Sequence, residues 1–175
     1  KTMTGKKSFI IVLLLTLILA FALSTGVSAN VTADATADYS LFYDSSNGKM
    51  YTDENATTQY TGQSDKWSAA YNTDVGSYIL TLKGFSFTTS APDALILPYD
   101  TTICLSNGTT NTLTSTFHGS AYSTGLLAAG DLTIYGNGNG TGKFVIDSGT
   151  SIDEYYSDGI YCENELTIVS GTIWA

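Results

Sequence analysis

The feature that most constrains this sequence is an internal repeat. Three segments align without gaps, residues 94–103, 125–134 and 159–168, and the offsets between them are 31 and 34 residues. Each copy contains a short apolar strand, a polar corner and a second, alternating strand, and residues 142–146 add a third strand after the middle copy. Strands and corners that recur at such a period are typical of repeat architectures, in which each turn of chain buries its apolar stripe against its neighbours. Three strands per turn predict an all-β protein built as a parallel β-helix.

The alternation within the repeats predicts which side chains face the interior. Successive side chains on a strand point to opposite faces, so equivalent positions in neighbouring repeats should stack. One predicted inward stack contains Leu95, Leu97, Leu126, Ala128, Ile160 and Cys162, and a second contains Ile103, Ile134 and Ile168. An earlier partial turn is predicted at residues 79–84 and 85–88. The last repeat would have an open edge, which predicts that the chain is truncated at its C-terminus and belongs to a longer protein.

The first residues have the pattern of a secretory signal. Lys6 and Lys7 precede a 15-residue hydrophobic run at residues 9–23, and small residues follow as far as Ala29. This order of charge, hydrophobic run and small residues indicates a signal peptide at residues 1–29, cleaved after Ala29. The run is shorter than the roughly 20 residues that span a bilayer. We therefore expect no membrane span after cleavage, with an uncleaved anchor as the alternative.

Residues 30–75 do not follow the repeat. Hydrophobic stretches at residues 39–43 and 49–51 flank a polar turn and predict a β-hairpin, and residues 67–71 predict a further strand. Repeat proteins need a capping element at their ends. We predict that this segment is an N-terminal β cap and that residues 76–175 form the turns of the β-helix.

The charge balance excludes nucleic acid as a partner. The chain contains no arginine, and from Asn30 onward four lysines are set against 16 acidic residues, a balance of 4 − 16 = −12. Binding to nucleic acid requires a basic surface that neutralises phosphates. Four lysines are too few to build such a surface against 16 acidic residues.

An acidic column is the first candidate site. Asp100, Asp131 and Glu165 occupy the same position in the three repeats, directly before the second strand. In a β-helix they would stack at about the 4.8 Å spacing of adjacent strands. Such closely spaced carboxylates repel one another unless solvent screens their charges, protons bind to them or a cation neutralises them. Calcium is the cation that carboxylates suit best. The alternative is that these residues only satisfy backbone groups at the turns.

An aromatic column is the second candidate site. Tyr122 and Tyr156 are 34 residues apart, each three residues before the repeat glycine, and Tyr155 is adjacent. These tyrosines are predicted to bind a ligand, because exposed rings form platforms for the flat faces of sugars; the alternative is a pair that only stabilises the sheet. Asp153, Glu154 and Asp158 surround Tyr155 and Tyr156 in an acidic loop, which we interpret as a solvated insertion.

Catalytic signatures are sparse. His118 is the only histidine and is expected in a surface loop, and the sequence has no G-x-S-x-G motif. A lyase acting on uronates would need a cation and a base near the substrate, and few lysines are available. A hydrolase would need paired carboxylates, which stacked acidic columns could supply. We predict a non-catalytic protein and keep both enzymes as a third possibility.

The two cysteines are predicted to be free thiols. The register makes Cys104 face outward and Cys162 inward, two turns away, whereas a disulfide requires Cα atoms within about 7 Å. Cys162 is expected to be buried as a small hydrophobic residue.

Several motifs are similar to those of a known family. Residues 78–85, 107–114, 130–136 and 158–161 resemble bacterial secreted right-handed β-helix proteins that are described as carbohydrate-binding domain-containing, and the resemblance covers about residues 75–175. It implies a pectate-lyase-like, right-handed β-helix, of which this chain would be an N-terminal fragment. It also implies binding of plant or cell-surface polysaccharide, in some cases with calcium, and a location that is secreted or on the bacterial cell surface. The alternative function is a structural adhesin or surface-stalk module.

Overall fold

The computed structural model describes residues 36–152 and 155–175, and the described chain is all-β, as predicted. No helix in these residues is long and apolar enough to span a membrane. The predicted signal peptide at residues 1–29 lies outside the described residues, as do Asp153 and Glu154 of the acidic loop.

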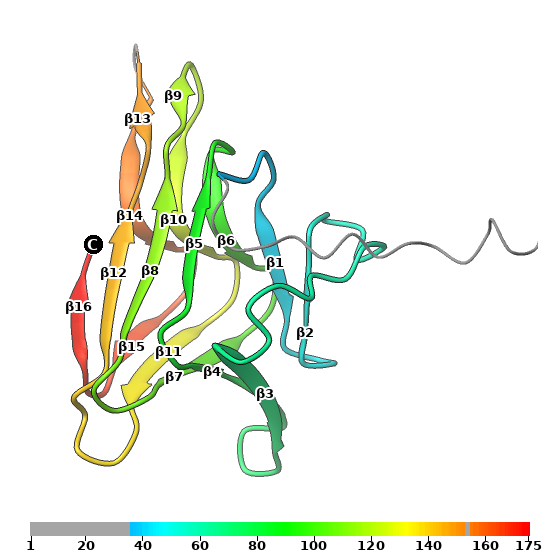
Figure 1. Cartoon of the computed structure of the whole chain (residues 1–175), viewed down its shortest axis with the longest axis vertical. Coiled ribbons are helices and arrows are strands. Elements are labelled where there is room, and N and C mark those ends of the chain that lie inside the picture. Colours follow the sequence, from blue (N-terminus) through cyan, green and yellow to red (C-terminus); the bar gives the residue numbers. More distant parts are fainter. Residues whose placement is uncertain (1–35, 153–154) are drawn as a thin grey trace, which may run out of the picture.

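Most strands belong to three sheets that lie around a common interior (Figure 1). The first sheet has the order β14 (Ser157–Cys162), β10 (Ser123–Ala128), β6 (Asp93–Leu97), β1 (Leu41–Asp44) and β2 (Lys49–Tyr51). The second has the order β15 (Leu166–Ile168), β11 (Leu132–Gly136), β7 (Thr101–Leu105), β4 (Ser77–Leu82) and β3 (Trp67–Asn72). The third has the order β16 (Thr172–Trp174), β12 (Lys143–Asp147), β8 (Thr110–Ser115) and β5 (Ser86–Thr89). A small fourth sheet pairs β13 (Thr150–Ser151) with β9 (His118–Gly119).

The chain passes through the first, second and third sheets in turn. The same order holds for β6, β7 and β8, for β10, β11 and β12, and for β14, β15 and β16. Within each sheet, the strands of successive repeats pair in parallel. Each sheet is therefore assembled from segments about 30 residues apart in the sequence, which is the arrangement that the internal repeat predicts.

The predicted register is confirmed in the first two sheets. Leu126 pairs with Leu95 on one side and with Ile160 on the other. Ile134 likewise pairs with Ile103 and Ile168. The repeats differ in length because their corner loops differ in length. Residues 106–109 connect β7 to β8, whereas the longer loop of residues 137–142 connects β11 to β12.

The hydrophobic core lies between the sheets and is built from the predicted stacks. Leu95, Leu97, Ile103, Leu126 and Ile134 are completely buried and belong to one cluster. Burial decreases at the last repeat, because β14, β15 and β16 are edge strands of their sheets in the described chain.

The second predicted stack shows this effect of the edge. Ile134 is 0% exposed, whereas Ile168, in the same column, is 49% exposed. The position of Ile168 is as predicted, but its burial is not, because the described chain has no strand paired on its far side.

The N-terminal segment contains the predicted hairpin and one feature that was not predicted. β1 and β2 form an antiparallel pair in which Tyr43 is opposite Met50. β1 also pairs in parallel with β6, so it is the first strand of an earlier repeat that continues through β4 and β5. β3 is the predicted additional strand and pairs antiparallel with β4. Antiparallel strands thus occupy the N-terminal edges of two sheets.

A buried asparagine connects three successive strands of the third sheet. The side chain of Asn111 is completely buried, and its Oδ1 accepts hydrogen bonds from the N–H groups of Gly84 (2.8 Å) and Phe85 (2.9 Å). Its Nδ2 donates to the carbonyl oxygen of Lys143 (3.1 Å) in the next repeat. A buried polar group needs such partners, and here they link consecutive repeats.

Both cysteines are free thiols. Cys104 lies outside the core cluster, yet only 5% of it is exposed, which differs from the surface position that an outward orientation implies. Tyr135 of the next repeat pairs with Cys104, and burial together with a hydrogen bond to this thiol raises the pKa of Tyr135 to about 12. Cys162 packs against the core but is only partly buried, because it lies on the edge strand β14.

Candidate functional site

The structure brings the three predicted tyrosines together. Tyr122 directly precedes β10, and Tyr155 and Tyr156 precede β14, so the parallel pairing of Ser123 with Ser157 makes their positions adjacent. The rings of Tyr122 and Tyr156 are nearly parallel, at 23°, with centroids 6.2 Å apart. Tyr155 presents its edge to Tyr122 at 90°, with centroids 5.3 Å apart. The predicted aromatic column is therefore confirmed as a ring cluster.

These rings are open to solvent. Tyr122 is 60% exposed and Tyr156 is 69% exposed, although each contacts another ring. A pair whose role is only to stabilise a sheet gains most when its apolar surface is covered. The exposed ring area is available to a ligand with an apolar face.

Hydrogen bonds fix the backbone beneath the rings. The Ser151 hydroxyl lies 2.7 Å from the carbonyl oxygen of Ala121 and 2.9 Å from that of Tyr156, so it bridges the segments that carry the two rings. The N–H of Ser123 donates to the same Tyr156 oxygen (3.2 Å). The Ser157 hydroxyl donates to Ser151 Oγ (3.1 Å). The backbone positions from which the rings project are therefore held in place before a ligand arrives.

A groove of about 360 Å³ adjoins the ring cluster on the outer face of the first sheet. Its described lining consists of Tyr122, Thr124, Leu127, Tyr156, Asp158 and Tyr161. Apolar and aromatic walls with a few polar groups are typical of small-ligand sites.

A change of side-chain direction in β10 places Thr124 and Leu127 in the same groove. Ser123 faces inward, where its Oγ lies 2.9 Å from the carbonyl oxygen of Pro92, and Leu126 belongs to the core. Strict alternation cannot place residues 124 and 127 on one face, and Gly125 lies between them. A Cβ at Gly125 would lie 2.4 Å from Cγ2 of Ile146 and 2.9 Å from the carbonyl oxygen of Gly159, so this position has no room for a side chain.

The electrostatic character of the groove is negative. Asp158 is the one charged side chain among its described lining residues. Thr124 pairs with Asp158 on one side and with Asp93 on the other, so the three residues form a row across the sheet. Burial raises the pKa of Asp93, and hydrogen bonds with Thr124 partly oppose this effect.

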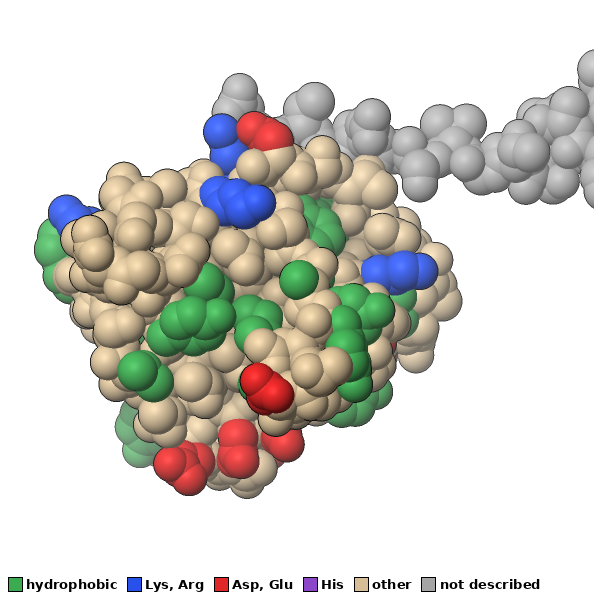
Figure 2. All heavy atoms as spheres, turned by 90° about the horizontal axis from the view of Figure 1, so that it is seen from below, with side chains coloured by type: hydrophobic (Ala, Val, Ile, Leu, Met, Phe, Trp, Pro, Cys, Tyr) green, Lys and Arg blue, Asp and Glu red, His purple; other side chains and the backbone are tan. Residues whose placement is uncertain are grey.

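The acidic column of Asp100, Asp131 and Glu165 is present at the predicted corner, but its carboxylates serve the backbone. Oδ1 of Asp100 accepts a hydrogen bond from the N–H of Asp131 (2.9 Å), and Oδ1 of Asp131 accepts one from the N–H of Glu165 (3.2 Å). Figure 2 shows acidic side chains gathered along one edge of the face seen from below, with lysines elsewhere on that face. These contacts favour the turn-stabilising interpretation.

Calcium binding by this column stays a prediction. In the described residues, no group of three or more histidine, cysteine, aspartate or glutamate side chains converges on a point that could hold a metal ion. Calcium takes six to eight oxygen ligands, whereas these carboxylates follow one another along the corner and each of the first two is engaged by the next repeat. The Asp100 and Asp131 carboxylates therefore have a backbone role whether or not a cation binds them.

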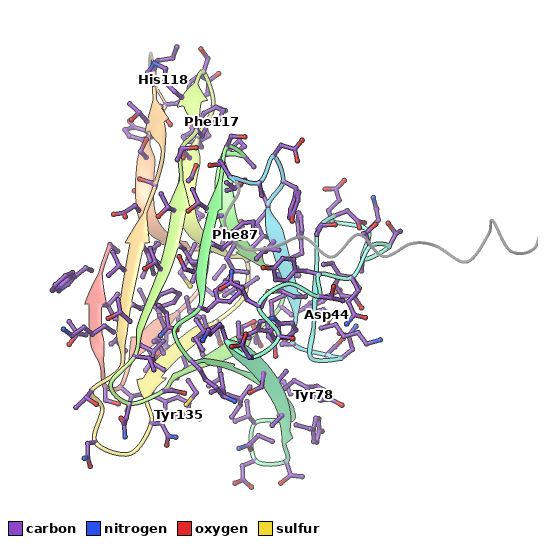
Figure 3. All side chains as sticks on the ribbon, in the orientation of Figure 1. Asp44, Tyr78, Phe87, Phe117, His118 and Tyr135 are labelled. Carbon is purple, nitrogen blue, oxygen red and sulfur yellow. The ribbon has the colours of Figure 1, made fainter. Side chains whose placement is uncertain are left out.

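His118 is not among the described lining residues of the groove. It is on the short strand β9, and Figure 3 shows it at one tip of the molecule beside Phe117, away from Asp44, Tyr78 and Tyr135. No histidine therefore contributes to the described groove lining.

Several groove residues were not predicted from the sequence. Thr124, Leu127 and Tyr161 lie on the outer face of β10 and β14, where Leu127 pairs with Tyr161. Asp158 was interpreted as part of a solvated insertion, but it belongs to β14 and lines the groove. The repeat alignment contained a signal for Leu127 and Tyr161, since both occupy the same outward position.

Comparisons of the chain with protein-family models, with curated proteins and with solved structures find no match. The resemblance to secreted carbohydrate-binding β-helix proteins therefore stays a prediction.

Proposed function

We propose that this protein is a secreted or cell-surface module that binds polysaccharide without cleaving it, through the tyrosine cluster and the adjoining groove. The observation that carries the proposal is the exposed ring cluster of Tyr122, Tyr155 and Tyr156 beside a groove with apolar walls. Pyranose rings present C–H groups on their faces and hydroxyl groups on their edges. The tyrosines suit the faces, while the exposed Asp158 carboxylate suits the hydroxyls.

The proposal includes the architecture. We infer that the three sheets are the faces of a right-handed parallel β-helix, with antiparallel strands capping its N-terminal end. The ordered passage of the chain through the sheets and the parallel pairing of successive repeats support this inference. In such a scaffold, equivalent outward positions form straight columns, so a groove that runs across β10 and β14 suits an extended chain.

The experiment that tests the function is a pull-down of the purified protein on insoluble cellulose and on pectic gel. Each matrix is used with calcium and with a chelator, and the supernatant is assayed for released sugar. We expect retention on at least one matrix, without sugar release. Sugar release would instead indicate a lyase or hydrolase, and a folded protein retained on neither matrix would indicate the adhesin or stalk. The chelator arm tests the calcium prediction separately.

Two variants connect retention to the groove. Tyr122→Ala combined with Tyr156→Ala removes both stacked rings, and we expect retention to fall at least about tenfold, since covering the apolar faces of the rings contributes roughly 25 cal/mol per Å². Tyr99→Ala is the matched control, because Tyr99 is 55% exposed but lies outside the groove. Equal losses in the two proteins would contradict the proposed site.

A further inference from the structure

We propose that the groove selects neutral polysaccharide chains and rejects anionic ones. This inference rests on the proposed function and specifies its ligand class. It separates glycans that carry only hydroxyl groups from glycans that carry uronate carboxylates or sulfates.

The first argument is the charge of the groove itself. Asp158 lines it, and no cationic side chain does so among the described residues. Asp93 lies in the same row across the sheet, separated from Asp158 by Thr124. A polysaccharide carboxylate that entered the groove would approach a like charge without any counter-charge in the lining, and like charges placed together oppose binding.

The second argument is the location of the lysines. From Asn30 onward the chain has four, Lys49, Lys66, Lys83 and Lys143, and no arginine. Lys49 is on β2 and Lys143 is on β12, while Lys66 and Lys83 flank β3 and β4. None belongs to β10 or β14, the strands that build the groove. Recognition of an acidic sugar would require a cation at that place.

The third argument is what a neutral chain offers to the same groups. A sugar hydroxyl can donate a hydrogen bond to the Asp158 carboxylate, and such charge-assisted bonds are stronger than neutral ones. The faces of the sugar rings lie against Tyr122 and Tyr156. Asp158 therefore favours a hydroxylated ligand and disfavours an acidic one.

The test uses pairs of polysaccharides that share a backbone and differ in charge. One pair is hydroxyethylcellulose and carboxymethylcellulose, and the other is highly methyl-esterified pectin and polygalacturonate. Binding is measured by affinity electrophoresis at low salt and at 1 M NaCl. We expect the neutral member of at least one pair to bind at least tenfold more tightly than its anionic partner at low salt, and the difference to shrink at high salt.

Asp158→Asn tests whether the Asp158 carboxylate causes the rejection of anionic chains. We expect this variant to bind the anionic member at least threefold more tightly than the wild-type protein does. Asp74→Asn is the control, since it removes the same charge from an exposed position in the β3–β4 turn. An equal gain in both variants would show that net charge, and not the groove, sets the preference.

The outcomes separate the two proposals. If the protein binds at least one pair, and in every pair that it binds the anionic member binds at least as tightly as its neutral partner, the selectivity is wrong and the binding function stands. If the folded protein binds none of the four polymers, the function is wrong and the selectivity fails with it. Circular dichroism of each variant confirms that it is folded before binding is compared.

Discussion

Oδ1 of Asp100 accepts a hydrogen bond from the backbone N–H of Asp131, which occupies the same position one repeat later. The Asp131 carboxylate repeats this contact with the N–H of Glu165. A carboxylate that accepts a backbone N–H at each corner secures the register of the following turn. The acidic column therefore has a structural role that does not require a metal ion.

Removal of this contact is expected to lower stability moderately. Asp100→Ala deprives the Asp131 N–H of its partner at an exposed corner, and we expect a loss of about 1 kcal/mol in the free energy of unfolding. Asp100→Asn keeps an oxygen at the acceptor position and should recover most of that loss. Urea denaturation of both variants, with calcium and with chelator, provides the measurement. A calcium-dependent stability that disappears in both variants would restore the metal interpretation.

Asn111 should be far more sensitive, because it is buried. Asn111→Ala removes the acceptor for the N–H groups of Gly84 and Phe85 and the donor to the Lys143 carbonyl. Buried groups left without partners cost about 1–3 kcal/mol each, so we expect a loss of roughly 3 kcal/mol in the free energy of unfolding. Thr112→Ala, on the outer side of the same strand, is the control, with an expected change below about 1 kcal/mol. Similar losses in the two variants would contradict this role.

The register could be predicted from the sequence because two independent patterns agree on it. The repeat fixes which strands are neighbours, and the alternation of apolar residues fixes which side chains face inward; a shift by one residue would expose Leu126 and Ile134. Both patterns concern the interior, where packing restricts the choice of residue.

The outer face was harder to predict because it has no such restriction. The groove depends on the change of direction at Gly125, which strict alternation does not anticipate. The burial of Cys104 depends on contact with Tyr135 of another repeat. The acidic column was located correctly, but the choice between binding a cation and binding a backbone N–H depends on side-chain geometry, which the order of residues does not contain.

Asp93 should make stability depend on pH. Burial raises its pKa in the folded state above the ordinary value, so the folded protein holds this proton more tightly than the unfolded chain. The stabilisation is complete below the ordinary pKa and is lost as the pH rises through the folded pKa. We therefore expect Asp93→Asn to raise the melting temperature at pH 7 and to give no gain at pH 3. Asp74→Asn, measured at both pH values, corrects for net charge. A gain of equal size at pH 3 would refute the assignment.

Ser151 should act on the ligand site through the position of the rings. Its hydroxyl bridges the carbonyl oxygens of Ala121 and Tyr156, so Ser151→Ala frees the segments that carry Tyr122 and Tyr156. We expect affinity for the neutral polysaccharides to fall about three- to tenfold, while the free energy of unfolding falls by about 1 kcal/mol or less, since Ser151 is not part of the core.

The tyrosine signal in near-ultraviolet circular dichroism distinguishes ring positioning from a general loss of stability. Rings held at 23° to each other should contribute a signal that weakens when their supporting backbone loosens. Ser151→Thr retains the hydroxyl and should restore both the signal and the affinity. If Ser151→Ala weakens binding with no change in the tyrosine signal, Ser151 does not position the rings. If Ser151→Thr fails to restore binding although the protein is folded, the hydroxyl is not the group that matters.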